Sequence, residues 1–422
     1  KMVIILLLKQ HNVANWLMIY GFMTLPLTYL VSKIVFAASY ILVLSFLALW
    51  LLNSAGFLGW LALLLSLVYL CLTAMLRPEY LEISFRLLTV ILIITSALRL
   101  SYVYDSYKLG SLIRLTGFIG LVSALFGLKQ FLFGYTDYEM NIAANIGSVV
   151  DEFLTLNSAR SMGISFDPLS QALLLGISFH CFGFIHKSEL RSFYKNIYFF
   201  AQFCIVISLL LTLNRSGIIA FILSLSIYLN FGMWVRLFSG ISGIFRAIIL
   251  FGFLYLIFFI LSLPEFDYPK RALLSVFEVF GIGDDTDEFF NRAQSLDKRM
   301  SSAQTIVEFV KHTPFGIRSE IADFSVNDVG ILSPIFKYGL LGGGVILTLM
   351  YIPLAGVARY YVTVSKSIRE ENTSRLIYSC YLVIVTSSIA SFSLDGTIMM
   401  LPSWFIICLA IRNTIRKRLE VG

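Results

Sequence analysis

Apolar runs long enough to cross a membrane recur along almost the whole length of this 422-residue chain. A helix of roughly 20 apolar residues spans the hydrocarbon core of a bilayer and pairs its own backbone polar groups there. The chain is 58% hydrophobic and only 14% charged, whereas a soluble domain is about 25% charged. The sequence therefore predicts an all-α, polytopic integral membrane protein and excludes a soluble globular domain.

The hydropathy pattern divides the chain into about twelve transmembrane helices. They are expected near residues 12–31, 34–52, 56–76, 84–101, 111–134, 168–186, 193–213, 216–231, 244–263, 329–354, 374–394 and 399–411. The resulting regions are N-terminal transmembrane helices (1–134), a first loop (135–167), central helices (168–263), a large loop (264–327), and C-terminal helices with a basic tail (328–422). Helical apolar spacing at 272–280 and 298–310 predicts that the large loop is itself helical.

Basic residues cluster in short loops, and this pattern predicts the side of the membrane that each loop occupies. The tail at 412–418 is strongly basic, so both termini are expected in the cytoplasm, where loops carry an excess of Lys and Arg. The two long loops then lie on the exterior side. The short loop between Arg77 and Arg86 falls on the exterior side against this rule, and its sidedness stays open. These loops account for the net charge of +7, which does not indicate a nucleic-acid partner.

The cysteines and histidines form no pattern typical of a metal site or a disulfide framework. The five cysteines all fall in apolar runs without CxxC spacing, and the four histidines are scattered along the chain. Buried cysteines of this kind behave as small hydrophobic residues. We therefore expect neither a metal nor any other cofactor.

Arg215 is the most unusual charged residue, because it stands between two apolar runs, at 203–213 and 218–231. An arginine facing lipid near the bilayer centre costs roughly 2–3 kcal/mol, whereas one at a wet cavity or beside an anion costs little. The planar guanidinium group fits the oxygens of a phosphate group. The position favours an anionic ligand such as a diphosphate. Two structural alternatives stay open, capping of the preceding helix and contact with lipid phosphates.

Further candidate residues fall on the side that the charge pattern assigns to the exterior. Arg160 precedes the sixth expected span, and Asp328 precedes the tenth. Arg299 and Arg318 lie in the large loop. Folding could bring these residues into one crevice at the outer membrane interface. The alternatives are a helix N-cap for Asp328 and surface ion pairs for the loop arginines.

Three stretches of the sequence together resemble the O-antigen ligase and polymerase superfamily. They are Leu-Asn-Arg-Ser-Gly at 213–217, the pattern Arg-x-x-Gly-x-x-x-Asp-Pro at 160–168, and the stretch 312–339. The stretches occur in the family's order and spacing, and the resemblance covers roughly residues 150–355. The helices before and after this region match the family in hydropathy alone.

The resemblance implies a membrane enzyme of GT-C-like architecture with a large helical periplasmic loop. Members of this superfamily move glycans from a polyprenyl diphosphate carrier on the outer face of the bacterial inner membrane. By motif position, Arg160 and Arg215 would hold the carrier diphosphate, and Arg299 occupies the place of a recurrent loop arginine. Asp328 stands where the ligases carry a histidine, which favours the polymerases (Wzy type) over the ligases. Arg318 is a further candidate for the diphosphate, although it does not strictly meet the Arg-x10-Gly motif of some polymerases.

The resemblance therefore implies an inner-membrane glycosyltransferase that joins undecaprenyl-diphosphate-linked oligosaccharide repeat units into O-antigen or a related surface polysaccharide on the periplasmic face. The expected reaction is metal-independent and inverting, with Asp328 as the general base. The expected partners are the lipid-linked donor and acceptor, membrane lipids and, from the family, a chain-length regulator protein. Two alternatives stay open. They are a ligase that transfers glycan to lipid A-core, and a flippase or transporter of the same lipid-linked oligosaccharide.

Overall fold

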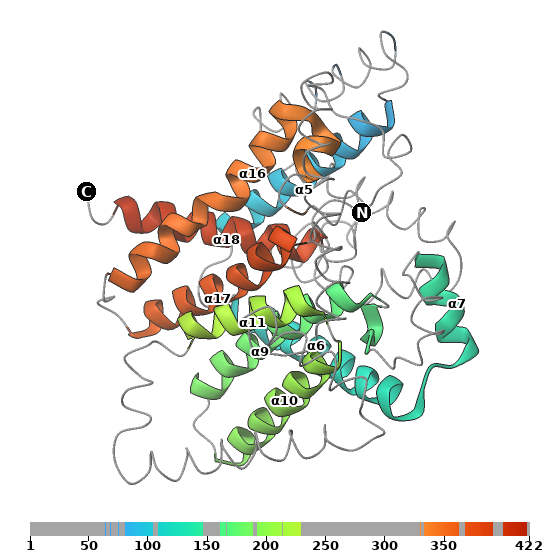
Figure 1. The fold of residues 1–422 in the computed structure, drawn as a ribbon. Coiled ribbons are helices and arrows are strands. Elements are labelled where there is room, and N and C mark those ends of the chain that lie inside the picture. The colour runs from blue at the N-terminus through green and yellow to red at the C-terminus, as the bar shows by residue number, and fades with distance from the viewer. Residues whose placement is uncertain are drawn as a thin grey trace, which may run out of the picture.

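The computed structural model describes residues 81–103, 109–146, 161–165, 167–188, 192–212, 214–228, 330, 333–362, 368–390 and 400–419, together with the helical Leu64, Val68 and Met75. Every regular element in these ranges is helical, and the helices pack into a bundle (Figure 1). The prediction of an all-α protein is therefore confirmed for the described part of the chain.

Each expected span that falls in the described ranges coincides with a helix. These helices are α5 (Leu81–Val103), α6 (Leu109–Phe133), α9 (Pro168–Ser188), α10 (Ser192–Leu211), α11 (Arg215–Tyr228), α16 (Ser333–Val362), α17 (Ile368–Ala390) and α18 (Met400–Leu419). The first loop contains a short helix, α7 (Asp137–Ile146), and a 3₁₀ turn, η3 (Gly163–Ser165). The expected helices at 12–31, 34–52 and 244–263 lie outside the described residues, as do most of 56–76 and the whole of 264–327.

Three of the described helices are long and apolar enough to cross a membrane. The qualifying stretches are Leu109–Phe133, Pro168–Ile185 and Tyr338–Val357, and four shorter apolar stretches accompany them in α5, α10, α11 and α18. Because apolar side chains are also exposed on the outside of the bundle, with Phe118 58% and Val345 59% exposed, the surface suits contact with lipid. These features support association with a membrane.

Helices α9 and α17 form the centre of the bundle. Helix α9 contacts α6, α10, α11 and α17, while α17 contacts α9, α11, α16 and α18. Both helices supply fully buried residues, among them Leu173, Leu174, Val383 and Ile384, and Trp404 of α18 is also fully buried. Figure 1 shows α17 between α16 and α18 on one side and α9 and α11 on the other.

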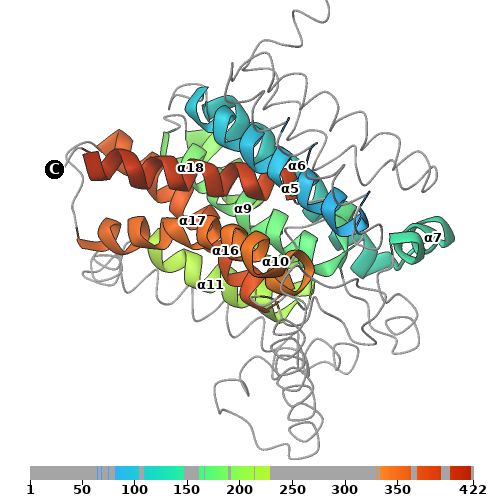
Figure 2. The same cartoon turned by 90° about the horizontal axis from the view of Figure 1, so that it is seen from above.

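The two ends of the bundle can be told apart by hydrogen bonds between helices. At one end Arg412 of α18 donates to the carbonyl of Ser101 in α5, and Thr414 lies 3.3 Å from the hydroxyl of Tyr378 in α17. At the other end α6 and α10 finish while α9 and α11 begin, around η3. We call this the η3 end. Helix α18 ends on the left of Figures 1 and 2, and α7 lies on the right.

Glycines allow α6 and α9 to approach closely. A Cβ atom added to Gly120 would lie 1.9 Å from Oγ of Ser178, whose hydroxyl donates to the carbonyl of Thr116 at 3.0 Å. Small residues let the backbones of two membrane helices approach closely. Inside a membrane, helices associate through such close packing, because the hydrophobic effect does not drive them together there. Position 120 is therefore closed to any side chain.

Substitution of Gly120 tests this packing. Gly120→Ala forces α6 away from α9, so we expect it to destabilise the protein by about 1–3 kcal/mol, the usual cost of overpacking. Gly110→Ala is the matched control, because nothing lies within 4 Å of a Cβ at Gly110 of the same helix. The measurement is the thermal unfolding of both purified variants in detergent. Equal transition temperatures for the two variants would contradict the packing described.

Candidate functional site

The residues that the sequence singles out are only partly described by the structure. Arg160, Arg299, Arg318 and Asp328 lie outside the described residues. Arg215 is the first residue of α11, and its side chain also lies outside the description. What the structure does describe is the backbone of residue 215 and the segment that follows position 160 in the sequence, with the side chains around them.

Two of the motifs place an N-cap residue at the start of a helix. Oδ2 of Asp167 accepts a hydrogen bond from the backbone N–H of Ser170 at 2.7 Å, and Pro168 takes the first helical position of α9. Oδ1 of Asn214 accepts from the backbone N–H of Gly217 and the hydroxyl of Ser216, both at 2.8 Å. These caps fix the points at which α9 and α11 begin.

The N-termini of α9 and α11 lie side by side at the η3 end. A Cβ atom on Gly217 of α11 would lie 2.4 Å from Cβ of Ala172 in α9, so the two helices touch within their first two turns. Farther along, the Nε2 atom of His180 lies 2.6 Å from Oγ of Ser224, so the helices run parallel. Two parallel helix dipoles then present their positive ends together, an arrangement that favours an anion.

A short segment, residues 161–165, which includes η3, is buried against this end. The backbone N–H of Ser161 donates to the carbonyl of Leu211, the last residue of α10, at 2.9 Å. Its hydroxyl lies 3.5 Å from that of Ser208. A Cβ atom on Gly127 of α6 would lie 2.1 Å from the Ser161 Oγ, so Gly127 leaves the space that the serine fills. The segment is thus held between α6 and α10.

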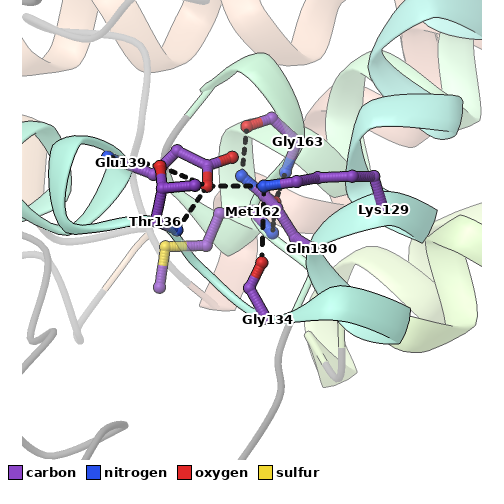
Figure 3. A network of polar contacts seen from close by, with 7 residues as sticks. All are labelled: Lys129, Gln130, Gly134, Thr136, Glu139, Met162 and Gly163. Atoms are coloured by element: carbon purple, nitrogen blue, oxygen red, sulfur yellow. Dashed lines mark hydrogen bonds and ion pairs between the residues drawn. The ribbon is translucent and has the colours of Figure 1, made fainter.

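Gln130 of α6 fixes the middle of the 161–165 segment. Its Oε1 atom accepts hydrogen bonds from the backbone N–H groups of Met162 at 3.1 Å and Gly163 at 2.8 Å. Its Nε2 atom donates to the Gly163 carbonyl at 3.3 Å. Figure 3 shows the carboxamide meeting the backbone of these two residues. Gln130 is fully buried, so water does not compete for these bonds.

Ser123 and Gln171 join the same segment to α6 and α9. The Ser123 hydroxyl donates to Oε1 of Gln171 at 2.6 Å and accepts from the backbone N–H of Ile164 at 3.2 Å. Nε2 of Gln171 donates to the Ser123 carbonyl at 3.2 Å. Ser123, Gln130 and Gln171 together form what we call the glutamine network. Each of its members is fully buried.

Gly163 has a left-handed backbone conformation that favours glycine. Its φ angle is +55°, a region that side-chain-bearing residues rarely adopt. A Cβ atom there would also lie 2.2 Å from the carboxamide of Gln171. Both the conformation and the space therefore require glycine at position 163.

An ion pair ties α7 to the end of α6. Nζ of Lys129 donates to Oε2 of Glu139 at 2.7 Å and to the Gly134 carbonyl at 3.4 Å (Figure 3). Oε2 of Glu139 also accepts from the N–H of Thr136 at 2.7 Å and from its hydroxyl at 2.9 Å, and Oγ1 of Thr136 accepts from the Glu139 N–H. This is a capping box at the start of α7. The side chain of Glu139 is 6% exposed and that of Lys129 is 37% exposed.

The environment of Glu139 keeps its carboxylate ionised. Burial alone raises the pKa of this carboxyl, but the hydrogen bonds and charge of Lys129 and the bonds from Thr136 outweigh it and lower the pKa below its ordinary value of 4.5. Among the described residues, the second oxygen, Oε1, has no hydrogen-bond partner. Glu139 is therefore a buried anion at the η3 end, and the described residues engage one of its two oxygens.

Gly339, the last residue of the 312–339 stretch, interrupts α16. Its φ and ψ angles are 72° and 179°, so the helix breaks there between a short first part and a long second part. The residue is buried. Before the helix, the N–H of Ser333 donates to the Gly330 carbonyl at 3.3 Å. The chain therefore enters α16 through a turn, and the glycine break follows inside the helix.

Sequence reasoning did not identify the glutamine network or the Lys129–Glu139 pair. The available signal is the spacing of Ser123, Gly127 and Gln130, which lie on one face of α6 because they are four and three residues apart. A polar stripe inside an apolar run indicates a buried partner. Within the described ranges, no group of three or more His, Cys, Asp or Glu residues is placed to hold a metal ion.

Substitution of two glycines separates backbone strain from loss of the network. Gly134 has a φ angle of +76° and nothing within 4 Å of an added Cβ. Gly134→Ala should cost only about 1–2 kcal/mol of left-handed strain. Gly163→Ala should cost clearly more, because it adds a collision with Gln171 to the same strain. The measurement is thermal unfolding of both variants, and a smaller loss for Gly163→Ala would contradict the geometry.

The Lys129–Glu139 pair should stabilise the protein in a pH-dependent way. Because the pKa of Glu139 is lowered on folding, its stabilisation is present above about pH 4.5 and is lost as the pH falls through the folded value. The stability advantage of wild type over Glu139→Gln should therefore be full at pH 7 and shrink toward pH 3, in thermal unfolding at fixed ionic strength. Asp137→Asn, at an exposed carboxyl of the same helix, is the control. The account of the pair fails if the stability advantage of wild type over Glu139→Gln does not depend on pH.

Comparisons with known proteins do not assign the chain to a family. No protein-family model, no curated protein and no solved structure matches it. Its functional assignment is therefore a proposal that rests on the motifs and on the geometry at the η3 end.

Proposed function

We propose that this chain is an inner-membrane glycosyltransferase that polymerises undecaprenyl-diphosphate-linked oligosaccharide repeat units into O-antigen or a related surface polysaccharide. The proposal includes about twelve transmembrane helices, a large helical loop on the periplasmic side, and both termini in the cytoplasm. It places the reaction at the η3 end of the bundle. Donor and acceptor are both lipid-linked, and a chain-length regulator is the proposed protein partner.

One hydrogen bond carries the proposal most directly. Ser161, which donates to the Leu211 carbonyl at 2.9 Å, directly follows Arg160 in the sequence. Arg215 begins α11 one short turn after Leu211. Because neighbouring Cα atoms are only about 3.8 Å apart, this contact supports the convergence of two arginines that the motifs assign to one diphosphate.

The electrostatics of the η3 end also suit a diphosphate. The N-termini of α9 and α11 lie together there, and their dipoles favour negative charge. Arginine is always charged and can bind phosphate oxygens in pairs. Fixed cations of this kind stabilise the charge that develops on a departing diphosphate, and removing one such group typically lowers kcat about 10²–10³-fold.

The proposed chemistry is a single displacement at the anomeric carbon of the donor. The acceptor hydroxyl oxygen forms the new bond to this carbon while the bond to the carrier diphosphate breaks. The bonding pair leaves with the diphosphate, whose charge Arg160 and Arg215 stabilise, with Arg299 and Arg318 as further candidates. The hydroxyl proton passes to Asp328, and a positioned base of this kind contributes about 10²–10⁴-fold. The configuration at the anomeric carbon is inverted.

The described helices favour this proposal over transport. A transporter of an anionic lipid-linked sugar needs charged groups near the middle of the bundle. Among the described residues, the buried charged side chains Glu139 and Arg375 lie near the bundle ends, where α7 and the first turns of α17 are found. The ligase alternative is disfavoured by Asp328, which stands where ligases carry a histidine.

Substitution of the proposed site residues tests the function in a reconstituted assay. Purified protein in liposomes receives polyprenyl-diphosphate-linked repeat units alone, and the chain length of the product is read on a gel. Arg160→Ala and Arg215→Ala should each lower the polymerisation rate about 100-fold or more, and Asp328→Asn at least as much. Arg114→Ala is the control, because Arg114 is an exposed arginine at the opposite end of α6.

Each contrary outcome has a distinct meaning. Chain growth by wild-type protein without any core acceptor excludes a pure ligase, whereas transfer that occurs only when lipid A-core is added supports the ligase instead. Near-normal polymerisation by Asp328→Asn refutes the assignment of the base. Equal rates for Arg160→Ala, Arg215→Ala and Arg114→Ala refute the proposed diphosphate site.

A further inference from the structure

Gln130 directs its described side-chain hydrogen bonds to one short stretch of backbone. Oε1 accepts from the N–H groups of Met162 and Gly163, and Nε2 donates to the Gly163 carbonyl. Burying an amide inside an apolar bundle is unfavourable unless the amide is hydrogen-bonded. Hydrogen bonds offset this cost here. In the described part of the chain, all of the side-chain hydrogen bonds of Gln130 are made to the 161–165 segment.

The rest of the glutamine network restrains the same segment from the other side. Ser123 accepts from the Ile164 N–H at 3.2 Å, and Gln171 holds the Ser123 hydroxyl in place. Gly163 fits against the Gln171 carboxamide with no room for a side chain. Three consecutive backbone N–H groups, from Met162 to Ile164, are thus paired by side chains of the network.

The position of this segment gives the restraint a functional meaning. It begins directly after Arg160 in the sequence, and its first residue, Ser161, is bonded to the last residue of the helix that precedes Arg215. Catalysis by fixed cations depends on where they are held, since a displacement of about 1 Å can cost about 100-fold in rate. A rigid attachment beside position 160 is what such a site requires.

We infer that Gln130 is a positioning residue for the diphosphate site, acting through the backbone of Met162 and Gly163 to fix the arginine that precedes them. The inference rests on the proposed function and deepens it. Gln130 touches no substrate in this account. Substitution of Gln130 should lower kcat, because Gln130 determines where the positive charge of Arg160 lies when the diphosphate departs. Binding of the lipid carrier should depend less on Gln130.

The first arm of the test compares variants of Gln130 in the reconstituted polymerisation assay. Gln130→Met keeps the length of the side chain and removes all three hydrogen bonds, so kcat should fall by up to about 100-fold with a smaller change in KM. Gln130→Glu keeps the acceptor for both N–H groups and should retain more activity than Gln130→Met. Gln202→Met is the control, because Gln202 of α10 also donates to a backbone carbonyl, that of Phe179 at 3.2 Å, away from the segment.

The second arm distinguishes positioning from a merely structural role. Gln130→Met is combined with Arg160→Lys and, separately, with Arg215→Lys. If Gln130 acts through Arg160, the loss that Gln130→Met causes should nearly disappear in the Arg160→Lys background and persist in the Arg215→Lys background. The same fold-loss in both backgrounds overturns the inference, because general destabilisation acts on every variant alike. Where Gln130→Met yields no folded protein, Gln130→Glu takes its place, with the same pattern at smaller amplitude.

The outcomes separate this inference from the proposed function. If Arg160→Ala abolishes polymerisation while Gln130→Met, Gln130→Glu and Gln202→Met all match wild type, the function stands and the positioning role is wrong. If Arg160→Ala matches wild type, the diphosphate site fails, and the positioning role fails with it.

Discussion

The pairing of buried backbone groups constrains this structure more than any other requirement. Where helices of a membrane bundle end, a chain that leaves the helical path exposes N–H and C=O groups that lipid cannot satisfy. The 161–165 segment lies in such a place, and most of it is buried. Its pairing comes from Gln130 and Ser123 of α6 and from the carbonyl that ends α10. The close approach of α6, α9 and α10 at the η3 end depends on these contacts.

The same contacts create conditions that suit a phosphate-bearing ligand. Holding the segment against α10 brings the sequence neighbour of Arg160 to the start of the turn that leads to Arg215. The N-caps Asp167 and Asn214 fix the starts of two parallel helices at this end. Lys129 neutralises the buried Glu139 nearby, so the carboxylate does not stand as an unpaired negative charge. Charge, helix direction and backbone rigidity thus agree at one end of the bundle.

Much of the described fold could be predicted from the sequence, because long apolar runs indicate membrane helices. The differences lie at polar helix ends. Helix α17 begins at Ile368 and α18 continues to Leu419, although residues 368–375 and 412–418 are too polar for hydropathy to assign to a span. Asp167 and Asn214 belong to the motifs at 160–168 and 213–217, but only the structure shows that they are N-caps. Gln130 and Gln171 could not be interpreted from sequence, because the meaning of a buried amide depends on a partner distant in the chain. The positions of Arg160, Arg299, Arg318 and Asp328 lie outside the described residues and stay predictions.

The central claim is that Arg160 and Arg215 stand together at an end of the bundle that faces the exterior. A direct measurement replaces both by cysteine, in a background whose native cysteines are changed to alanine, and treats intact cells with a short, membrane-impermeant bismaleimide. The account predicts an intramolecular cross-link between the two positions, protected by added polyprenyl-diphosphate-linked saccharide. Cysteines at the two positions that label singly without cross-linking, or that react only after the membrane is permeabilised, would contradict it.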